Sequence, residues 1–276
     1  GTYQYLCVFN TDGTDYVDSN TAIVTVNPPS SGGSSGSGGG RYTPPPATTP
    51  PQGPPNQPIT ATAPVTAARG TNGIANANIP TSAIPDAITR AEATARAQGS
   101  SANGISIELN VTMPQGATSL TAAIPQSALQ SLVTAGVNQF TVNGAPVSLG
   151  LNQSALQAIQ SQASGGITIG MTPATGLSAS AQSMIGSRPV YNITISYTDK
   201  SGKTQNITSF GSGTATLAIP YTAGRNEAAG YLFGVYVDGK GNASRIPGSV
   251  YDANSRSILI PTNHLSVYGV GYTIKK

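Results

Sequence analysis

The sequence predicts an α+β fold that is mostly β: an antiparallel, sandwich-like domain with a few short helices, preceded by a linker and a terminal hairpin. Three observations support this prediction. Runs of alternating apolar and polar residues, separated by turn signals, recur along the second half of the chain. Helical segments rich in Ala occur in the first half of the long C-terminal region. Gly and Pro, at 33 and 21 of 276 residues, exceed ordinary usage.

Composition divides the chain into three regions. Residues 1–27 contain two strand-like runs around an Asp-Gly turn signal, and two strands cannot bury a core in water. We therefore expect this hairpin to be the last piece of a domain that begins upstream. Residues 28–60 read as a linker, with a Ser/Gly stretch followed by a Pro/Thr-rich stretch that favours extended polyproline II. Residues 61–276 are long enough for one sizeable core.

The N-terminal hairpin resembles the final two strands of an immunoglobulin-like domain. The resemblance rests on a Gly-x-Tyr-x-Tyr-x-Cys pattern at residues 1–7, followed by a turn and by Ala-x-Val-x-Val at residues 22–26. Cys7 falls where that family places its second cysteine, so the resemblance implies a partner upstream. From its residue type alone, Cys7 is expected to be a small buried hydrophobe.

The first half of the main domain mixes helices and strands. An Ala-rich segment from Asp86 to Gln98 predicts a helix, and Gly99 is placed to end it. Strict alternation from Ile105 to Val111 predicts a strand.

An internal repeat follows. The segment 126–132 recurs 27 residues later at 153–159, with five identical residues at its start. Each copy follows a short apolar strand (120–124 and 147–151) and precedes a glycine and a second strand (137–142 and 167–171). Asn152 is a suitable N-cap for the second copy. The predicted unit is strand–helix–strand, present as paired elements within one domain.

The second half is predicted to be strands joined by hairpin turns. The turns are 199–203 and 238–242, where Asp and Gly favour tight reversals. The predicted strands are residues 190–198, 204–210, 215–219, 231–237, 257–260 and 267–274.

Several short motifs in this half, taken in order, resemble the uncharacterised domain that precedes S-layer homology repeats in Gram-positive cell-surface proteins. They are Arg188-Pro189-Val190-Tyr191, Ile219-Pro220-Tyr221-Thr222, the run 236–242, Ile246-Pro247-Gly248, Tyr251-Asp252-Ala253 and the run 262–268. The resemblance covers residues 75–274. It implies a secreted bacterial surface protein whose partners are cell-wall polysaccharide or neighbouring surface modules.

Composition also excludes several classes of function. A net charge of +3, with 8% charged residues, is too weak a field for nucleic-acid binding. No apolar run is long enough to predict a membrane span. One His and one Cys cannot build a Cys/His zinc site, and no phosphate-binding loop or other cofactor motif is present. We expect neither a metal nor a cofactor.

One tripeptide offers specific chemistry. His264-Leu265-Ser266 is similar to the self-cleavage motif of the autoproteolytic domain in adhesion receptors. In that chemistry Ser266 would attack the Leu265 carbonyl with His264 as base, and water would resolve the ester. The alternative interpretation is a histidine at the mouth of a hairpin, hydrogen-bonded to backbone.

Other candidate sites have structural interpretations beside them. Glu92, Glu108 and Glu227 are far apart in sequence, and nothing marks a glycosidase pair. The run 238–242 faintly resembles a calcium loop but fits a hairpin turn better. Six tyrosines between residues 221 and 272 could form a sugar platform, although half-buried strand positions explain them well. The leading interpretation is a non-catalytic spacer module, with self-cleavage and glycan binding as alternatives.

Overall fold

The computed structural model describes residues 57–144 and 146–273, together with the backbone of four short strands between residues 2 and 25. The chain divides into two compact units, residues 1–48 and 49–276, which we describe separately.

In the N-terminal unit, β1 (Thr2–Tyr5) pairs antiparallel with β4 (Ala22–Thr25), and β2 (Val8–Thr11) pairs antiparallel with β3 (Asp15–Asp18). The segment 3–9, predicted as one strand, is described as β1 and the start of β2, and β3 is not predicted from the sequence. The predicted turn at Asp12-Gly13 lies outside the described residues. Cys7 and residues 28–56 of the predicted linker lie outside the described residues. The immunoglobulin-like origin of this hairpin stays a prediction.

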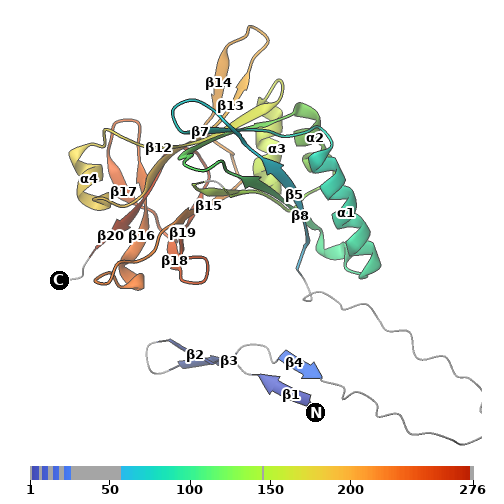
Figure 1. Ribbon diagram of the computed structural model, residues 1–276, viewed down its shortest axis with the longest axis horizontal. Helices are drawn as coiled ribbons and strands as arrows, with labels where there is room; N and C mark the ends of the chain where they lie inside the picture. The colour runs from blue at the N-terminus through green and yellow to red at the C-terminus, as the bar shows by residue number, and fades with distance from the viewer. Residues whose placement is uncertain are drawn as a thin grey trace, which may run out of the picture. The chain divides into compact units, whose positions relative to one another are not determined.

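The C-terminal unit is built on two sheets (Figure 1). One has seven strands in the order β18-β19-β15-β11-β10-β8-β5, and we call it the seven-stranded sheet. Its strands are β5 (Ile59–Thr66), β8 (Ile105–Thr112), β10 (Gln139–Asn143), β11 (Ser148–Asn152), β15 (Ala215–Pro220), β18 (Val250–Asp252) and β19 (Ser257–Thr262). β5 begins inside the end of the predicted linker.

The second, nine-stranded sheet has the order β17-β16-β20-β13-β12-β9-β7-β6, with β14 paired to β13. Its strands are β6 (Ala68–Arg69), β7 (Ile74–Asn78), β9 (Ser119–Ile124), β12 (Ile167–Pro173), β13 (Val190–Thr198), β14 (Thr204–Ile207), β16 (Leu232–Val237), β17 (Ala243–Arg245) and β20 (Val267–Tyr272). The predicted strand 204–210 thus ends earlier, at Ile207. The predicted hairpins appear as the antiparallel pairs β13–β14 and β16–β17.

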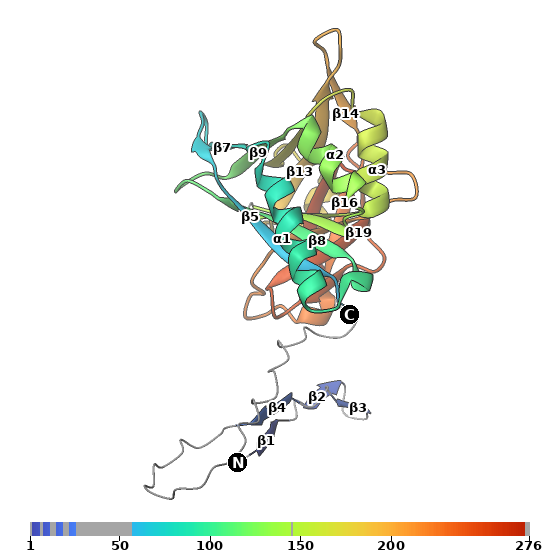
Figure 2. The same cartoon turned by 90° about the vertical axis from the view of Figure 1, so that its right-hand side faces the viewer.

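Four α-helices complete the described unit: α1 (Ala83–Ala97), α2 (Gln126–Thr134), α3 (Gln153–Gln162) and α4 (Ala179–Ile185). There are also two short 3-10 turns in the described residues: η1 (Ser101–Asn103) follows α1, and η2 (Ala229–Tyr231) precedes β16. Helix α2 packs against both α1 and α3. Figure 2 looks onto these three helices, which lie side by side on one side of the two sheets.

The predicted fold class, a mostly β, sandwich-like α+β domain, is confirmed. The sheets are mixed rather than wholly antiparallel, however, because β5–β8, β8–β10 and β7–β9 are parallel pairs. The reason is the path of the chain. Both β7-α1-β8 and β9-α2-β10 cross from the nine-stranded to the seven-stranded sheet through a helix, so corresponding strands emerge side by side in the same direction.

The repeat predicted from sequence has the expected structure: β9-α2-β10 and β11-α3-β12 are both strand–helix–strand units. Their helices bury the same repeat positions, Ala128, Leu129 and Leu132 in α2 and Ala155, Leu156 and Ile159 in α3. The second unit runs in the opposite sense, from the seven-stranded to the nine-stranded sheet.

The structure also identifies a third copy that the sequence analysis missed. The segment 79–84, Ile-Pro-Thr-Ser-Ala-Ile, leads from β7 into α1 as the segment 124–129, Ile-Pro-Gln-Ser-Ala-Leu, leads from β9 into α2. It lies 45 residues before the segment 124–129, so a search at a period of 27 residues does not find it. The predicted helix end at Gly99 is confirmed, with φ +65° there and a Ser100 N–H to Ala95 O hydrogen bond of 2.9 Å.

One apolar core joins both sheets and α1, α2 and α3. Alternating residues of β8 point into it, and Ile107 and Leu109 are fully buried. Helix α4 packs separately on β16, β17 and β20, around Ile185, Phe233 and Val235. Outward positions on strands such as β10 and β15 carry polar, uncharged side chains, for example Thr141, Asn143 and Thr216.

Candidate functional site

The tripeptide proposed for self-cleavage lies in the connection between β19 and β20. Leu265 is buried in the core, with 7% of its surface exposed, and its N–H donates to Thr208 O (3.3 Å). The Ser266 hydroxyl donates to Val237 O at 3.0 Å, and Ser266 O accepts from Ile193 N–H at 2.9 Å. Hydrogen bonds of the tripeptide therefore connect the start of β20 to β13, to β16 and to the segment before β15.

The His264 carbonyl is the centre of a hydrogen-bond cluster. It accepts from Thr262 Oγ1 (2.9 Å) and from the Tyr268 hydroxyl (2.7 Å), and these two hydroxyls lie 2.8 Å apart. Tyr268 is 1% exposed, and burial raises its pKa to about 12. Its hydroxyl consequently stays protonated, and able to donate, across the physiological range.

The His264 ring has other partners than Ser266. Nδ1 lies 3.0 Å from Asn263 Oδ1, and the ring packs edge-on against Tyr236 with centroids 4.9 Å apart. An acyl shift needs a base at the serine hydroxyl and donors at the Leu265 carbonyl. In the described residues the donors converge on the preceding carbonyl, and the Ser266 hydroxyl points to β16. The partners of the His264 ring are side-chain oxygens of Asn263 and Thr262, so the predicted bond from the histidine ring to backbone is not seen in this part of the chain. Self-cleavage stays a prediction.

A second cluster of hydrogen-bonded side chains connects the loop after β15 to Arg188, which lies just before β13. Glu227 Oε1 accepts from Arg188 Nε (2.8 Å) and Nη2 (2.5 Å), while Oε2 accepts from the Tyr221 hydroxyl and from Gly224 N–H (2.9 Å). Both charged side chains are largely buried, 20% exposed for Arg188 and 14% for Glu227. Burial opposes ionisation of Glu227, but the hydrogen bonds and the Arg188 charge outweigh it and hold its pKa below the ordinary value.

The same guanidinium covers an aromatic ring. Arg188 lies 5.1 Å from the ring centroid of Tyr272, whose hydroxyl donates to Asn226 O at 3.1 Å. Tyr231 meets Tyr272 edge-on, with an interplanar angle of 84°. The Tyr236 and Tyr268 rings are tilted by 42°. These pairs are packed at angles to one another, so they match the structural interpretation of the tyrosines better than a flat sugar platform.

The predicted acidic candidates lie on separate elements. Glu92 is on the exposed side of α1 and pairs with Arg96 at 3.6 Å, Glu108 is on β8, and Glu227 is in the loop after β15. The Asp238 carboxylate accepts from Lys240 N–H and Asn242 N–H, both at 2.8 Å, as expected for a hairpin turn. Among residues 57–144 and 146–273, no group of three His, Cys, Asp or Glu could hold a metal. Nor is any helix in these ranges long and apolar enough to cross a membrane.

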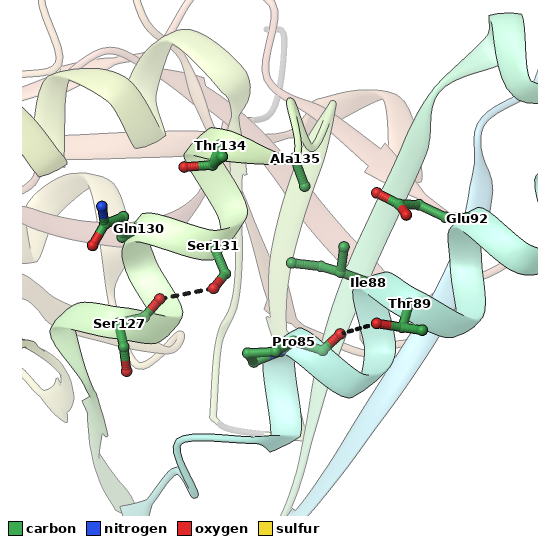
Figure 3. A pocket seen from close by; sticks show the side chains of 9 residues that line it. All are labelled: Pro85, Ile88, Thr89, Glu92, Ser127, Gln130, Ser131, Thr134 and Ala135. Carbon is green, nitrogen blue, oxygen red and sulfur yellow. Dashed lines mark hydrogen bonds between the residues drawn. The ribbon is translucent and has the colours of Figure 1, made fainter.

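A hollow of about 600 Å³ forms a groove between α1 and α2 (Figure 3). Two of its hydroxyl groups are used within their own helices. Thr89 donates to Pro85 O at 3.0 Å, and Ser131 donates to Ser127 O at 2.9 Å. Ile88, 6% exposed, belongs to the core between the helices. We interpret the groove as a consequence of helix packing.

A different hollow, of about 470 Å³, lies on the outer face of the seven-stranded sheet. It spans β10, β11, β15 and β19 and reaches the turn after β18. Its lining is dominated by hydroxyl and amide side chains, including Gln139, Thr141, Asn143, Thr216, Ser255 and Ser257. Sequence analysis did not find it, because its residues come from four separate segments. The only available signal was the alternation that places polar residues on the outward face of each strand.

Comparison with family models, with curated proteins and with solved structures found no match to this chain.

Proposed function

We propose that the main domain is a non-catalytic structural spacer of a secreted bacterial cell-surface protein. In this proposal it links immunoglobulin-like modules to a wall anchor, in the manner of domains associated with S-layer homology repeats. The observation that carries the proposal is the position of the first and last strands of the domain, β5 and β20, in two sheets that share one core. The chain enters through β5, at the edge of the seven-stranded sheet, and leaves through β20, inside the nine-stranded sheet.

These two strands lie on opposite sides of the domain in Figure 1, and one core joins their sheets. Tension applied to the ends would therefore act through the shared core. The surface chemistry also supports the proposal, since no ionisable residue occurs from Leu109 to Ser187. A fold whose central part carries no charge responds little to changes of salt and pH outside a cell.

Single-molecule pulling through positions 57 and 273 tests this role. We expect one cooperative unfolding step that releases the chain from β5 to β20, at no more than about 3.6 Å per residue. A matched control pulls through Ser201, at the tip of the β13–β14 hairpin, and position 273. Strand β5 also lies at an edge, but it packs against α1 and buries Ala63 and Val65. Strand β14 pairs with β13 alone and buries only Ile207, so it should peel away at lower force. Stepwise loss of β5 at low force in the first geometry would contradict the spacer role.

Intact-mass analysis tests the autoproteolytic alternative. A spacer keeps one uncut mass, both as the native chain and as Ser266→Ala. Release of a peptide beginning at Ser266, abolished by Ser266→Ala, would replace the spacer proposal with self-cleavage.

A further inference from the structure

We infer that the outer face of the seven-stranded sheet binds a neutral glycan chain, in the 470 Å³ hollow over β10, β11, β15 and β19. Its volume lies in the range of about 300–1,000 Å³ that is typical of small-molecule sites. The inference concerns binding and does not depend on the spacer role.

The floor of the hollow is made by a missing side chain. Gly150 lies at the centre of β11, paired with Thr141 of β10 on one side and Thr216 of β15 on the other. A Cβ built on Gly150 would lie 2.6 Å from Gln139 Nε2. The amide of Gln139 therefore lies over the glycine, at the rim of a row of two threonines. A larger residue at position 150 would displace this amide and project into the hollow.

The Ser255 and Ser257 hydroxyls at one end of the hollow are bonded within their own segment, whereas the polar groups on β10 are only weakly engaged. Between Gln139 Nε2 and Thr141 Oγ1 the distance is 3.5 Å, and Asn143 Nδ2 lies 3.4 Å from Asn110 Oδ1. These are long for hydrogen bonds. They contrast with the 2.9–3.0 Å bonds that occupy the Thr89 and Ser131 hydroxyls of the α1–α2 groove. The sheet face therefore offers donors and acceptors that a ligand can use.

The charge of the lining selects the ligand class. The residues that line the hollow in the described structure include no Lys or Arg. Its carboxylate, Asp252, accepts hydrogen bonds from Ser255 Oγ (2.5 Å) and Asn254 N–H (3.1 Å) within its own turn. A phosphate-bearing or otherwise anionic polymer would meet no counter-charge here. A hydroxyl-rich, uncharged chain matches the mixed donors and acceptors.

The remaining lining fits the same class. Ala218 and Leu259, paired across β15 and β19, form a small apolar strip beside the hydroxyls. A pyranose ring presents hydroxyls at its edge and C–H groups on its face, so it can use both. A protein partner fits less well, because protein interfaces are enriched in aromatic residues, Met and Arg and depleted in Ser.

The other sheet supplies an internal control. Gly170 of β12 lies between Thr121 of β9 and Thr194 of β13, which is the same Thr-Gly-Thr arrangement on the outer face of the nine-stranded sheet. A Cβ there would meet Thr194 Oγ1 at 2.6 Å, again the end of a side chain. The substitutions Gly150→Leu and Gly170→Leu thus make the same change in two similar rows, of which only the first lies in the hollow.

The test is calorimetric titration of the full chain with cellotetraose, maltotetraose and tetra-N-acetylchitotetraose, and with tetragalacturonate as the acidic counterpart. We expect at least one neutral tetraose to bind and tetragalacturonate not to bind. Gly150→Leu should lower the affinity at least tenfold, and Gly170→Leu should leave it unchanged. The pair of isosteric substitutions Thr141→Val and Thr216→Val should also lower it, because both remove hydroxyls without filling the hollow.

Circular dichroism and sedimentation on each variant keep the test interpretable. The inference is overturned if no neutral tetraose binds, if the acidic tetramer binds better, or if Gly150→Leu and Gly170→Leu have equal effects. Self-association lost in Gly150→Leu alone would assign the face to a second copy of the chain instead.

Discussion

Helices α2 and α3 begin with the same five residues, Gln-Ser-Ala-Leu-Gln, yet they are held at their N-termini in different ways. Helix α2 follows Pro125, whose extended backbone has φ −60° and which supplies no side-chain cap. Helix α3 follows Asn152, whose Oδ1 accepts from Ala155 N–H at 2.9 Å. Pro presets the backbone before a helix, whereas Asn satisfies one of its unpaired N–H groups.

The Asn152 cap also extends beyond its own helix. The same Oδ1 accepts from Thr214 N–H (3.0 Å), and Nδ2 donates to Thr214 Oγ1 (2.9 Å). One side chain thus fixes both the start of α3 and the entry to β15. The comparison teaches that the residue before a repeated helix decides how its N-terminus is held. Asn152 precedes α3, where the segment before β15 lies close enough to share the cap, whereas Pro125 precedes α2.

The largest loss of stability should come from substituting Gly213, which precedes β15 and packs against the start of α3. A Cβ on Gly213 would lie 2.3 Å from Ala155 N, a backbone atom that cannot move aside. Gly213→Ala should lower the free energy of unfolding by about 3 kcal/mol, measured by urea denaturation. The matched change at α2 is Gly166→Ala, where the nearest atom is Ile124 O at 2.9 Å, and it should cost about 1 kcal/mol. Equal losses would mean that the two helix starts are packed alike.

A smaller effect should distinguish the caps themselves. Asn152→Ala removes the cap of α3 and the bonds to Thr214, and should cost about 2 kcal/mol. Pro125→Ala should change stability by less than about 1 kcal/mol, mainly through the unfolded chain. Hydrogen exchange at Ala155 and Ala128 would show which helix start opens first. Faster exchange at Ala128 in Asn152→Ala would contradict local capping.

The smallest effect should come from the loop held by Glu227. Unlike residues 109–187, which include no ionisable side chain, this loop depends on a charge and should respond to pH. Because the folded pKa of Glu227 is lowered, its contribution is fully present above the unfolded value and is lost as pH falls through the folded pKa. Glu227→Gln should therefore cost about 1 kcal/mol at neutral pH and progressively less in acid. The measurement is urea denaturation at a series of pH values. A constant difference across pH would show that the carboxylate charge is not responsible, and Glu92→Gln on exposed α1 serves as the control.

The elements with local causes could be predicted well. The helix ending at Gly99, the Asn152 cap, the paired repeat and the turns at Asp199 and Asp238 all appear in the structure. Each depends on residues within a few positions of one another, where capping, glycine conformation and side-chain-to-backbone bonds act. The candidate site was less predictable. The sequence marked His264 and Ser266, but not that Val237 accepts the serine hydroxyl.

What the sequence by itself determined is thus the kind of those elements that have a local signal, and the polar, nearly uncharged character of the outward strand positions. Tertiary structure decided which strands became neighbours. Two helical crossovers in the same sense made β7–β9 and β8–β10 parallel, and a third in the opposite sense placed β12 antiparallel to β9. The chain later returned to the seven-stranded sheet as β15, which pairs with β11. The hollow over Gly150 exists only because of that pairing, which sets Thr141 and Thr216 on either side of it. The physical reason is that alternation and capping act locally along the chain, whereas strand partners are chosen by burying one common core.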